Sequence, residues 1–146
     1  MPLKGIPASI TSELLYALAR MGHGDSIVIA DANFPSDSVA MNCVVKTPIR
    51  VSGLTSSILR DIMELMPLDT YEPSGIFVMD RVQADKDRGL VVPAYDAIIG
   101  ATGGETALTY EERSKFYEHA KKSFCIVQTD DLTLYANVIV SKGIVV

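Results

Sequence analysis

Two stretches of the chain carry apolar residues at the three- and four-residue spacing of an amphipathic helix. The first stretch follows Thr11 and Ser12, which suit a helix N-terminus, and Gly22 is expected to end that helix in the left-handed conformation. The second stretch follows Gly53 and is expected to stop at Pro67. The apolar positions are Leu14, Leu15, Leu18 and Met21 in the first helix and Leu54, Ile58, Leu59, Ile62, Met63 and Met66 in the second.

Short apolar runs between helical patterns predict strands. Residues 26–30 form a continuous run rich in β-branched side chains, which is typical of a strand covered on both faces by helices. The other expected elements are strands at 76–79, near Leu108, at 124–127 and at 138–140, a short helix at 95–99, a charged loop at 85–89 and a polar helix at 111–123. The segment 39–51 is ambiguous, and Pro48 would place any strand there at a sheet edge. The alternation favours one α/β domain over 1–146, with helices packed on a central mixed sheet.

Composition narrows the classes of partner. Of the 146 residues, 48% are hydrophobic and 21% are charged, which is the balance of an ordinary globular domain. The net charge of −5 argues against a nucleic-acid partner and against an anionic membrane surface. No apolar run reaches the roughly 20 residues that span a bilayer, and the first residues lack a signal-peptide core, so a cytoplasmic location is expected. Cys43 and Cys125 are far apart and are expected to be reduced core thiols.

His23 is the first candidate for acid–base chemistry. It stands between Gly22 and Gly24, in a loop open to close approach, and histidine exchanges protons near neutral pH. The alternative is a loop histidine that caps the C-terminus of the preceding helix, where the helix dipole favours a cation. The spacing alone does not decide between the two. The second histidine, His119, is expected to be solvated on a charged helix face.

The second candidate position is the end of the strand at 26–30, where Asp31 and Asn33 follow. Ligands bind beyond the carboxyl ends of strands in open α/β sheets, although Asp31 could instead only form an Asx turn. A phosphatase nucleophile is disfavoured because no second aspartate follows two residues later. His23 and Asp31 are eight positions apart on either side of one strand, which is roughly 26 Å along an extended path. If both serve one monosaccharide-sized ligand, we expect that site to lie between subunits.

Five further polar residues are candidates, each with a structural alternative. Asp69 could act as an acid or base, or it could simply be a turn residue. Tyr117, near Arg113 on the polar helix, could donate its hydroxyl to a ligand, or its ring could only contribute to packing. Tyr135 and Asn137 open the last strand, where an aromatic face beside an amide suits a sugar. The structural alternative is that both residues only flank a hairpin turn. The glycines at 100–104 lack the residues of a phosphate loop, and the histidines lack metal-ligand spacing, so no cofactor and no metal is expected.

Seven short runs occur in an order and spacing that are specific together, although each is weak alone. They are Glu13-Leu14-Leu15, Leu18-Ala19-Arg20-Met21-Gly22-His23-Gly24-Asp25, Asp31-x-Asn33-Phe34-Pro35, Leu68-Asp69-Thr70-Tyr71, Phe116-Tyr117-Glu118-x-Ala120, Tyr135-Ala136-Asn137 and Lys142-Gly143. From about residue 3 to residue 145 the chain resembles the fucose mutarotase / ribose pyranase family. The third, fourth and fifth runs resemble the fucose branch. Ala136 departs from it, because fucose-type members usually carry glycine there and ribose-type members alanine, so the resemblance leaves the preferred sugar open.

The resemblance implies a cytoplasmic isomerase that interconverts sugar anomers, with an α/β fold and a ring assembly, commonly a decamer, whose sites lie between neighbouring subunits. It implies that His23 is a proton donor and that Asp69 and Tyr117 are further catalytic residues. It implies sugar contacts at Asp31, Met79, Arg113, Tyr135 and Asn137, of which Met79 and Arg113 match the less distinctive positions. L-Fucose is the expected substrate and D-ribose the second. The alternatives are a sugar-binding protein without catalysis and a purely structural ring-forming domain, and the titratable His23 argues for catalysis.

Overall fold

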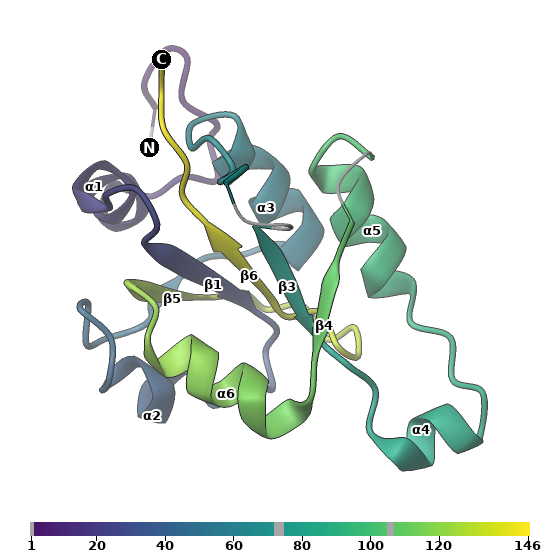
Figure 1. Ribbon diagram of the computed structural model, residues 1–146. Helices are drawn as coiled ribbons and strands as arrows, with labels where there is room; N and C mark the ends of the chain where they lie inside the picture. Colours follow the sequence, from purple (N-terminus) through teal and green to yellow (C-terminus); the bar gives the residue numbers. More distant parts are fainter. Residues whose placement is uncertain (1, 72–74, 105–106) are drawn as a thin grey trace.

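The sheet is built around β1 (Ser26–Ala30). The computed structural model describes residues 2–71, 75–104 and 107–146, and there β1 pairs in parallel with β5 (Cys125–Gln128) and antiparallel with β6 (Val138–Ser141) (Figure 1). β6 is also antiparallel to β3 (Ile76–Met79). The two edges are β2 (Ile49–Arg50), parallel to β5, and β4 (Thr109–Glu111), parallel to β3. The described strands thus form a six-stranded mixed sheet in the order β2-β5-β1-β6-β3-β4, which confirms the predicted architecture.

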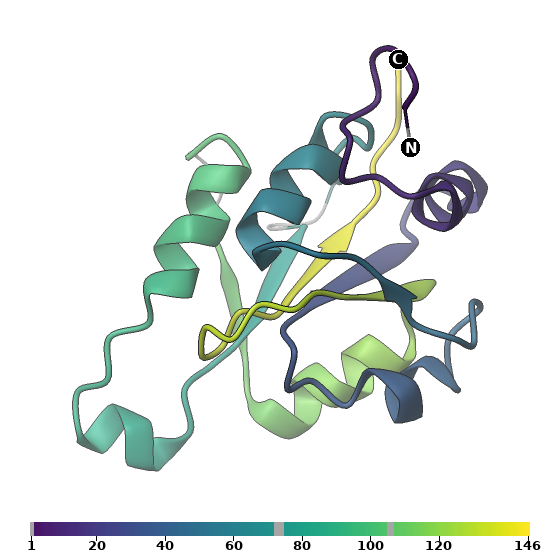
Figure 2. The same ribbon diagram turned by 180° about the vertical axis from the view of Figure 1, so that it is seen from behind.

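Helices cover both faces of the sheet (Figure 1, Figure 2). The described helices are α1 (Ser12–Arg20), α2 (Ser36–Ala40), α3 (Thr55–Met63), α4 (Gln83–Asp87), α5 (Pro93–Ala101) and α6 (Arg113–Lys121). Buried side chains of α1, α3 and α5 share one core with Ile27 and Ile29 of β1, whereas those of α2 and α6 share a second core with Val28. Side chains alternate across a strand, so a strand buried on both faces is apolar at every position, as the run at 26–30 predicted.

The end of α1 differs from the prediction that Gly22 is left-handed. The helix stops at Arg20, Met21 is extended, and the positive φ of this loop, +86°, belongs to Gly24. The Lys142 ammonium donates to the carbonyl oxygens of Leu18 (2.8 Å) and Met21 (2.6 Å). A side chain from the far end of the sequence therefore satisfies the last carbonyls, and no glycine turn is needed to do so.

Three other predictions are corrected in detail. α3 ends at Met63 rather than at Pro67, because residues 64–66 turn away while Met66 stays buried in the core. The segment 85–89, expected to be a charged loop, overlaps α4, which has no buried residue of its own and projects from the body of the molecule (Figure 1). The polar helix begins at Arg113 rather than at Glu111, because Glu111 pairs with Met79 as the last residue of β4.

His119 is not simply solvated, which is also a correction. Its Nδ1 lies 2.8 Å from Oε1 of the buried Glu111, and its ring packs edge-on against Phe77 with the centroids 4.7 Å apart. The end of β4 supplies the Glu111 carboxylate, and the spacing of polar residues along the helix could not show that this carboxylate lies beside His119. Within residues 2–71, 75–104 and 107–146, no helix has the length and apolarity needed to cross a membrane. Both cysteines are free and buried.

Candidate functional site

A polar hollow of about 210 Å³ lies at the end of the sheet where β1 and β3 stop and β6 begins. It is lined by Asp31, Asn33, Phe34, Met79, Asp85, Tyr117, Leu134, Tyr135 and Asn137. Five of the eight residues predicted for the site thus come together here: Asp31, Met79, Tyr117, Tyr135 and Asn137. They reach the same place from four separate regions of the sequence, because the strand ends that carry four of them meet at one edge of the sheet and α6, which carries Tyr117, packs beside it.

Asp31 and Asn137 form a matched pair at the floor of the hollow. The Asn137 amide oxygen accepts the Asp31 backbone N–H at 2.8 Å, and its Nδ2 donates to Asp31 Oδ2 at 3.1 Å. The Asn33 N–H donates to Asp31 Oδ1 at 3.0 Å, so the predicted Asx turn is also present. Burial raises the pKa of Asp31, and the hydrogen bonds from Asn33 and Asn137 oppose that shift. Each carboxylate oxygen keeps a further lone pair, which suits a sugar hydroxyl.

Aromatic side chains form one wall of the hollow. The rings of Phe34 and Tyr117 are 5.6 Å apart between centroids. The Arg113 guanidinium lies 5.5 Å from the Tyr117 centroid, and Arg113 itself does not line the hollow. Met79 lines it and is almost fully buried. A carboxylate and amide beside aromatic faces match the mixed surface of a sugar, which has apolar C–H faces and polar hydroxyls.

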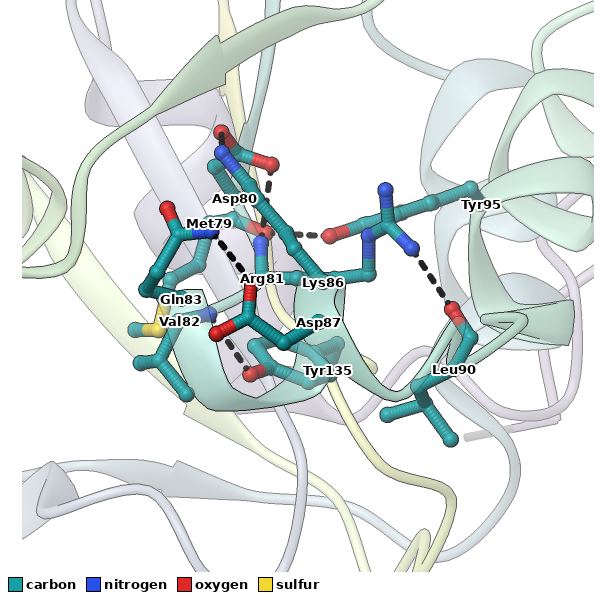
Figure 3. Close-up of polar contacts among 10 residues, drawn as sticks. All are labelled: Met79, Asp80, Arg81, Val82, Gln83, Lys86, Asp87, Leu90, Tyr95 and Tyr135. Carbon is teal, nitrogen blue, oxygen red and sulfur yellow. Dashed lines mark hydrogen bonds and ion pairs between the residues drawn. The ribbon is translucent and has the colours of Figure 1, made fainter.

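Tyr135 adopts an unusual backbone conformation. Its φ of +60° is the only positive value among the non-glycine residues that the structure describes. This conformation costs on the order of 1–2 kcal/mol for an L-residue, so surrounding contacts must hold it. The phenol donates to Asp85 Oδ2 at 2.6 Å and accepts the Val82 N–H at 3.0 Å, as Figure 3 shows for Val82. Burial and the Asp85 carboxylate both raise the pKa of Tyr135.

Asp85 is the residue of this hollow that sequence reasoning missed. It lies in the segment that was assigned to a charged surface loop, and it reaches Tyr135 across 50 positions of sequence. No local pattern marks it, because its role depends on a tyrosine from the opposite end of the chain.

His23 and Asp69 lie at the other end of the same strands. The Nε2 atom of His23 is 3.3 Å from Asp69 Oδ1, and the His23 ring packs against Tyr71 at 5.3 Å between centroids. Asp69 is buried and accepts the Tyr71 N–H at 3.1 Å, while its own N–H donates to the Ser141 carbonyl at 2.9 Å. The Tyr71 N–H, followed by His23, holds the pKa of Asp69 below its usual range. The carboxylate is therefore charged at neutral pH and orients the imidazole.

The alternative in which His23 caps α1 is not supported. Lys142 already donates to the carbonyls of Leu18 and Met21, and the contact of the His23 ring is with Asp69. The two groups of candidates stay apart within one chain. His23 precedes Ser26, which pairs with Ser141, whereas Asp31 follows the opposite end of β1.

In the part of the chain that the structure describes, no cluster of three or more His, Cys, Asp or Glu side chains could hold a metal ion. The polar groups of the hollow are arranged instead as hydrogen-bond donors and acceptors. Together the sheet, its two helical layers and this hollow define an α/β protein with a site for a small polar ligand.

Comparison with known proteins gives the family. The chain belongs to the RbsD / FucU transport protein family, whose pattern matches residues 4–145. It is 47% identical over 146 residues to fucose mutarotase from Homo sapiens, covering 97% of this chain and 94% of the relative. This confirms the resemblance on which the site residues were assigned.

Two solved structures are similar over nearly their full length. FucU from Bifidobacterium longum has a TM-score of 0.87 at 37% identity, covering 98% of this chain and 100% of the other. The fucose mutarotase from Streptococcus pneumoniae, solved in complex with L-fucose, has a TM-score of 0.84 at 38% identity, covering 99% of this chain and 100% of the other. Both confirm the predicted fold class.

Proposed function

We propose that this protein is a mutarotase that interconverts the α and β anomers of free L-fucose. The observation that carries the proposal is the hollow in which the Asp31–Asn137 pair faces the aromatic wall of Phe34 and Tyr117. The relatives named as fucose mutarotases, one of them solved with L-fucose, support the choice of reaction and of sugar. D-Ribose is the second substrate to test, because Ala136 is the one departure from the fucose-type pattern.

The reaction needs one base and one acid. The base removes the proton of the anomeric hydroxyl while the acid protonates the ring oxygen, and the bond between that oxygen and the anomeric carbon breaks. The open-chain aldehyde turns its carbonyl face, and the reverse proton transfers close the ring as the other anomer. The protons balance over the cycle, and each well-placed acid or base contributes roughly 10²–10⁴-fold.

In this proposal His23 moves one of the two protons. The charged Asp69 carboxylate favours the His23 tautomer with its proton on Nε2, which leaves Nδ1 to exchange protons with the sugar. Asp69 thus acts mainly on the orientation and tautomer of His23, and Tyr117 supplies the second proton-transfer group. Asp31, Tyr135 and Asn137 hold sugar hydroxyls, Met79 packs against the ring, and Arg113 acts through the Tyr117 ring.

The same proposal requires two copies of the chain for each complete site. His23 and Asp69 belong to one end of β1 and the Asp31 hollow to the other, so one monosaccharide cannot touch both groups in one chain. We infer a closed ring in which His23 of one copy faces the hollow of its neighbour, with a decamer as the expected size. A cytoplasmic location is part of the proposal, and it is supported by the two free, buried cysteines.

The test is NMR saturation transfer between the α and β anomers of L-fucose, with and without the protein, repeated with D-ribose. Faster exchange with L-fucose supports the proposal, and faster exchange with D-ribose alone would assign the protein as a ribose pyranase. If folded protein binds L-fucose and accelerates neither exchange, the protein is a sugar-binding protein without catalysis and the proposal is wrong.

A further inference from the structure

The segment that carries α4 forms one wall of the sugar hollow from outside the body of the protein. α4 has no buried residue, and it lies away from the helical layers on both faces of the sheet (Figure 1). Asp85 nevertheless lines the hollow, together with Tyr135 and Asn137. The hydrogen bonds of Tyr135 to Asp85 and to the Val82 N–H connect this segment to the β6 end of the sheet.

Two protein partners already occupy most of the hydrogen-bonding capacity of the Tyr135 phenol. A phenol has one proton to donate and two lone pairs that accept. The proton is directed to Asp85 Oδ2 at 2.6 Å. One lone pair accepts the Val82 N–H at 3.0 Å, a contact that Figure 3 shows. One lone pair of the phenol oxygen remains without a protein partner among the described residues. Tyr135 can therefore accept a hydrogen bond from a sugar hydroxyl, but it has no proton left to donate.

Asp85 is itself held in place. Its Oδ1 accepts from Arg88, with Nε and Nη2 each 2.9 Å away, while Oδ2 faces Tyr135. The hydrogen bond from Tyr135, followed by Arg88, keeps the pKa of Asp85 below its usual range. The carboxylate therefore stays charged at neutral pH, and a charged acceptor draws the phenol proton more strongly than a neutral one.

We propose that Asp85 is a positioning residue of the sugar site, which accepts the hydrogen bond of the Tyr135 phenol and so presents that phenol to the sugar only as an acceptor. The inference rests on the proposed function for its substrate, L-fucose, and it adds a residue from α4 to that site. It also gives a reason for the strained backbone of Tyr135: the conformation aims the phenol at Asp85 of α4 and at the N–H of Val82, which directly precedes that helix.

The variants are Asp85→Ala, Tyr135→Phe and the two together. Asp87→Ala is the matched control, because Asp87 is an exposed carboxylate of the same helix whose hydrogen bond is to Gln83 of its own helix (Figure 3). Initial exchange rates over a range of L-fucose concentrations separate KM from kcat. Asp85→Ala is expected to raise KM about five- to tenfold and to change kcat less than about twofold, because the Tyr135 phenol is no longer held as an acceptor for a sugar hydroxyl while the acid and base remain. Asp87→Ala is expected to match the wild type.

The double variant tests the coupling. In the Tyr135→Phe background, Asp85→Ala is expected to change KM by less than about twofold further, because the group it positions is absent. An independent readout is the NMR titration of Tyr135 in protein labelled with ¹³C-tyrosine. Its pKa is expected to fall toward the ordinary value in Asp85→Ala, since a charged neighbour that holds the phenol proton is gone.

Three outcomes would overturn the positioning role. They are a KM for Asp85→Ala equal to that of Asp87→Ala, fully multiplicative effects in the double variant, and an unchanged Tyr135 pKa. If the wild type binds L-fucose without accelerating exchange, the proposed function has failed while this inference is still tested by calorimetry. It then stands if Asp85→Ala weakens fucose binding about five- to tenfold, and it falls if affinity is unchanged. A wild type with no affinity for L-fucose would overturn both.

Discussion

The Nε2 atom of His23 lies 3.3 Å from Oδ1 of Asp69, across 46 positions of sequence. The histidine is partly exposed in a glycine-flanked loop, whereas the aspartate is buried and fixed by the Tyr71 N–H. A partly exposed imidazole is thus held against a buried, charged acceptor. In the proposed function, this pair is what distinguishes a mutarotase from a protein that only binds sugar.

His23→Ala is expected to lower the catalysed rate of L-fucose exchange by about 10²-fold or more, because the variant loses a proton-transfer group. The size of the assembly, measured by sedimentation velocity, is expected to stay that of the wild type. Asp69→Asn keeps the shape of the partner and removes its charge, so its loss should be smaller than that of His23→Ala. Wild-type turnover in His23→Ala would remove this residue from the mechanism.

Mixing two inactive variants tests whether the site is shared between copies. His23→Ala removes the group at one end of β1, and Asp31→Asn alters the hollow at the other end. In a random one-to-one mixed assembly, about a quarter of shared sites would combine an intact His23 with an intact hollow. Co-expressed variants, purified as one assembly, are expected to regain up to that fraction of the wild-type rate. No regain in a verified mixed assembly would place the whole site within one chain.

Gly143 is a position where any side chain would displace the Asp69 segment. A Cβ at this residue would lie 2.5 Å from the Leu68 carbonyl oxygen and 3.1 Å from the Asp69 Cα. Gly143→Ala is therefore expected to lower the free energy of unfolding by about 2 kcal/mol or more and to weaken catalysis through Asp69. Urea denaturation and the exchange assay measure the two effects.

Gly100→Ala is the matched control for this substitution. A Cβ at Gly100, in α5, would meet nothing within 4 Å, and alanine is the better helix former. This control is expected to stabilise the protein by roughly 0.5–1 kcal/mol. Equal effects of the two glycine substitutions would contradict the close approach of Gly143, which follows β6, to Leu68.

Asp131 caps α3 from a distant part of the chain. Leu54 precedes the helix and offers no side-chain cap, whereas Asp131 Oδ2 accepts the Thr55 N–H at 2.9 Å and Oδ1 accepts the Thr133 N–H at 2.8 Å. Asp131→Ala is expected to cost about 1–3 kcal/mol, because it leaves the buried Thr55 N–H unpaired and removes the acceptor of the Thr133 N–H. Asp130→Ala, which removes an exposed acceptor for the Gly53 N–H, is expected to cost less. Midpoints of urea unfolding compare the two variants, and equal losses would argue against the cap.

The raised pKa of Asp31 makes a prediction about pH. Because burial raises this pKa in the folded state, the folded protein binds the proton more tightly than the unfolded chain does. The stability that protonation contributes is present below the unfolded pKa, about 3.9, and is lost as pH rises through the folded value. Asparagine does not titrate, so the free energy of unfolding of Asp31→Asn relative to the wild type is expected to increase between about pH 3 and about pH 7. A difference that stays constant over this range would mean that Asp31 is not desolvated.

Some of the site could be predicted from the sequence because its residues stand at positions with a local signature. The run at 26–30 predicts a buried strand, and that strand places Asp31 at its end and His23 before its start. Tyr135 and Asn137 were found in the same way, at the opening of the last strand. The resemblance supplied Asp69, Tyr117, Met79 and Arg113, which local reasoning left open or did not mark.

The sequence alone also determined the class of fold. Apolar periodicity and the continuous run at 26–30 favour a sheet with helices on both faces, because burial on both faces makes every position of a strand apolar. Strand order, the antiparallel insertion of β6 between β1 and β3, and the helix that contains Asp85 were decided by tertiary structure. The contacts of Asp69 with His23, of Tyr135 with Asp85, and of Lys142 with the end of α1 were decided there too. Each of these joins residues separated by 46 positions or more, and a local pattern holds no information on which distant partner satisfies a given polar group.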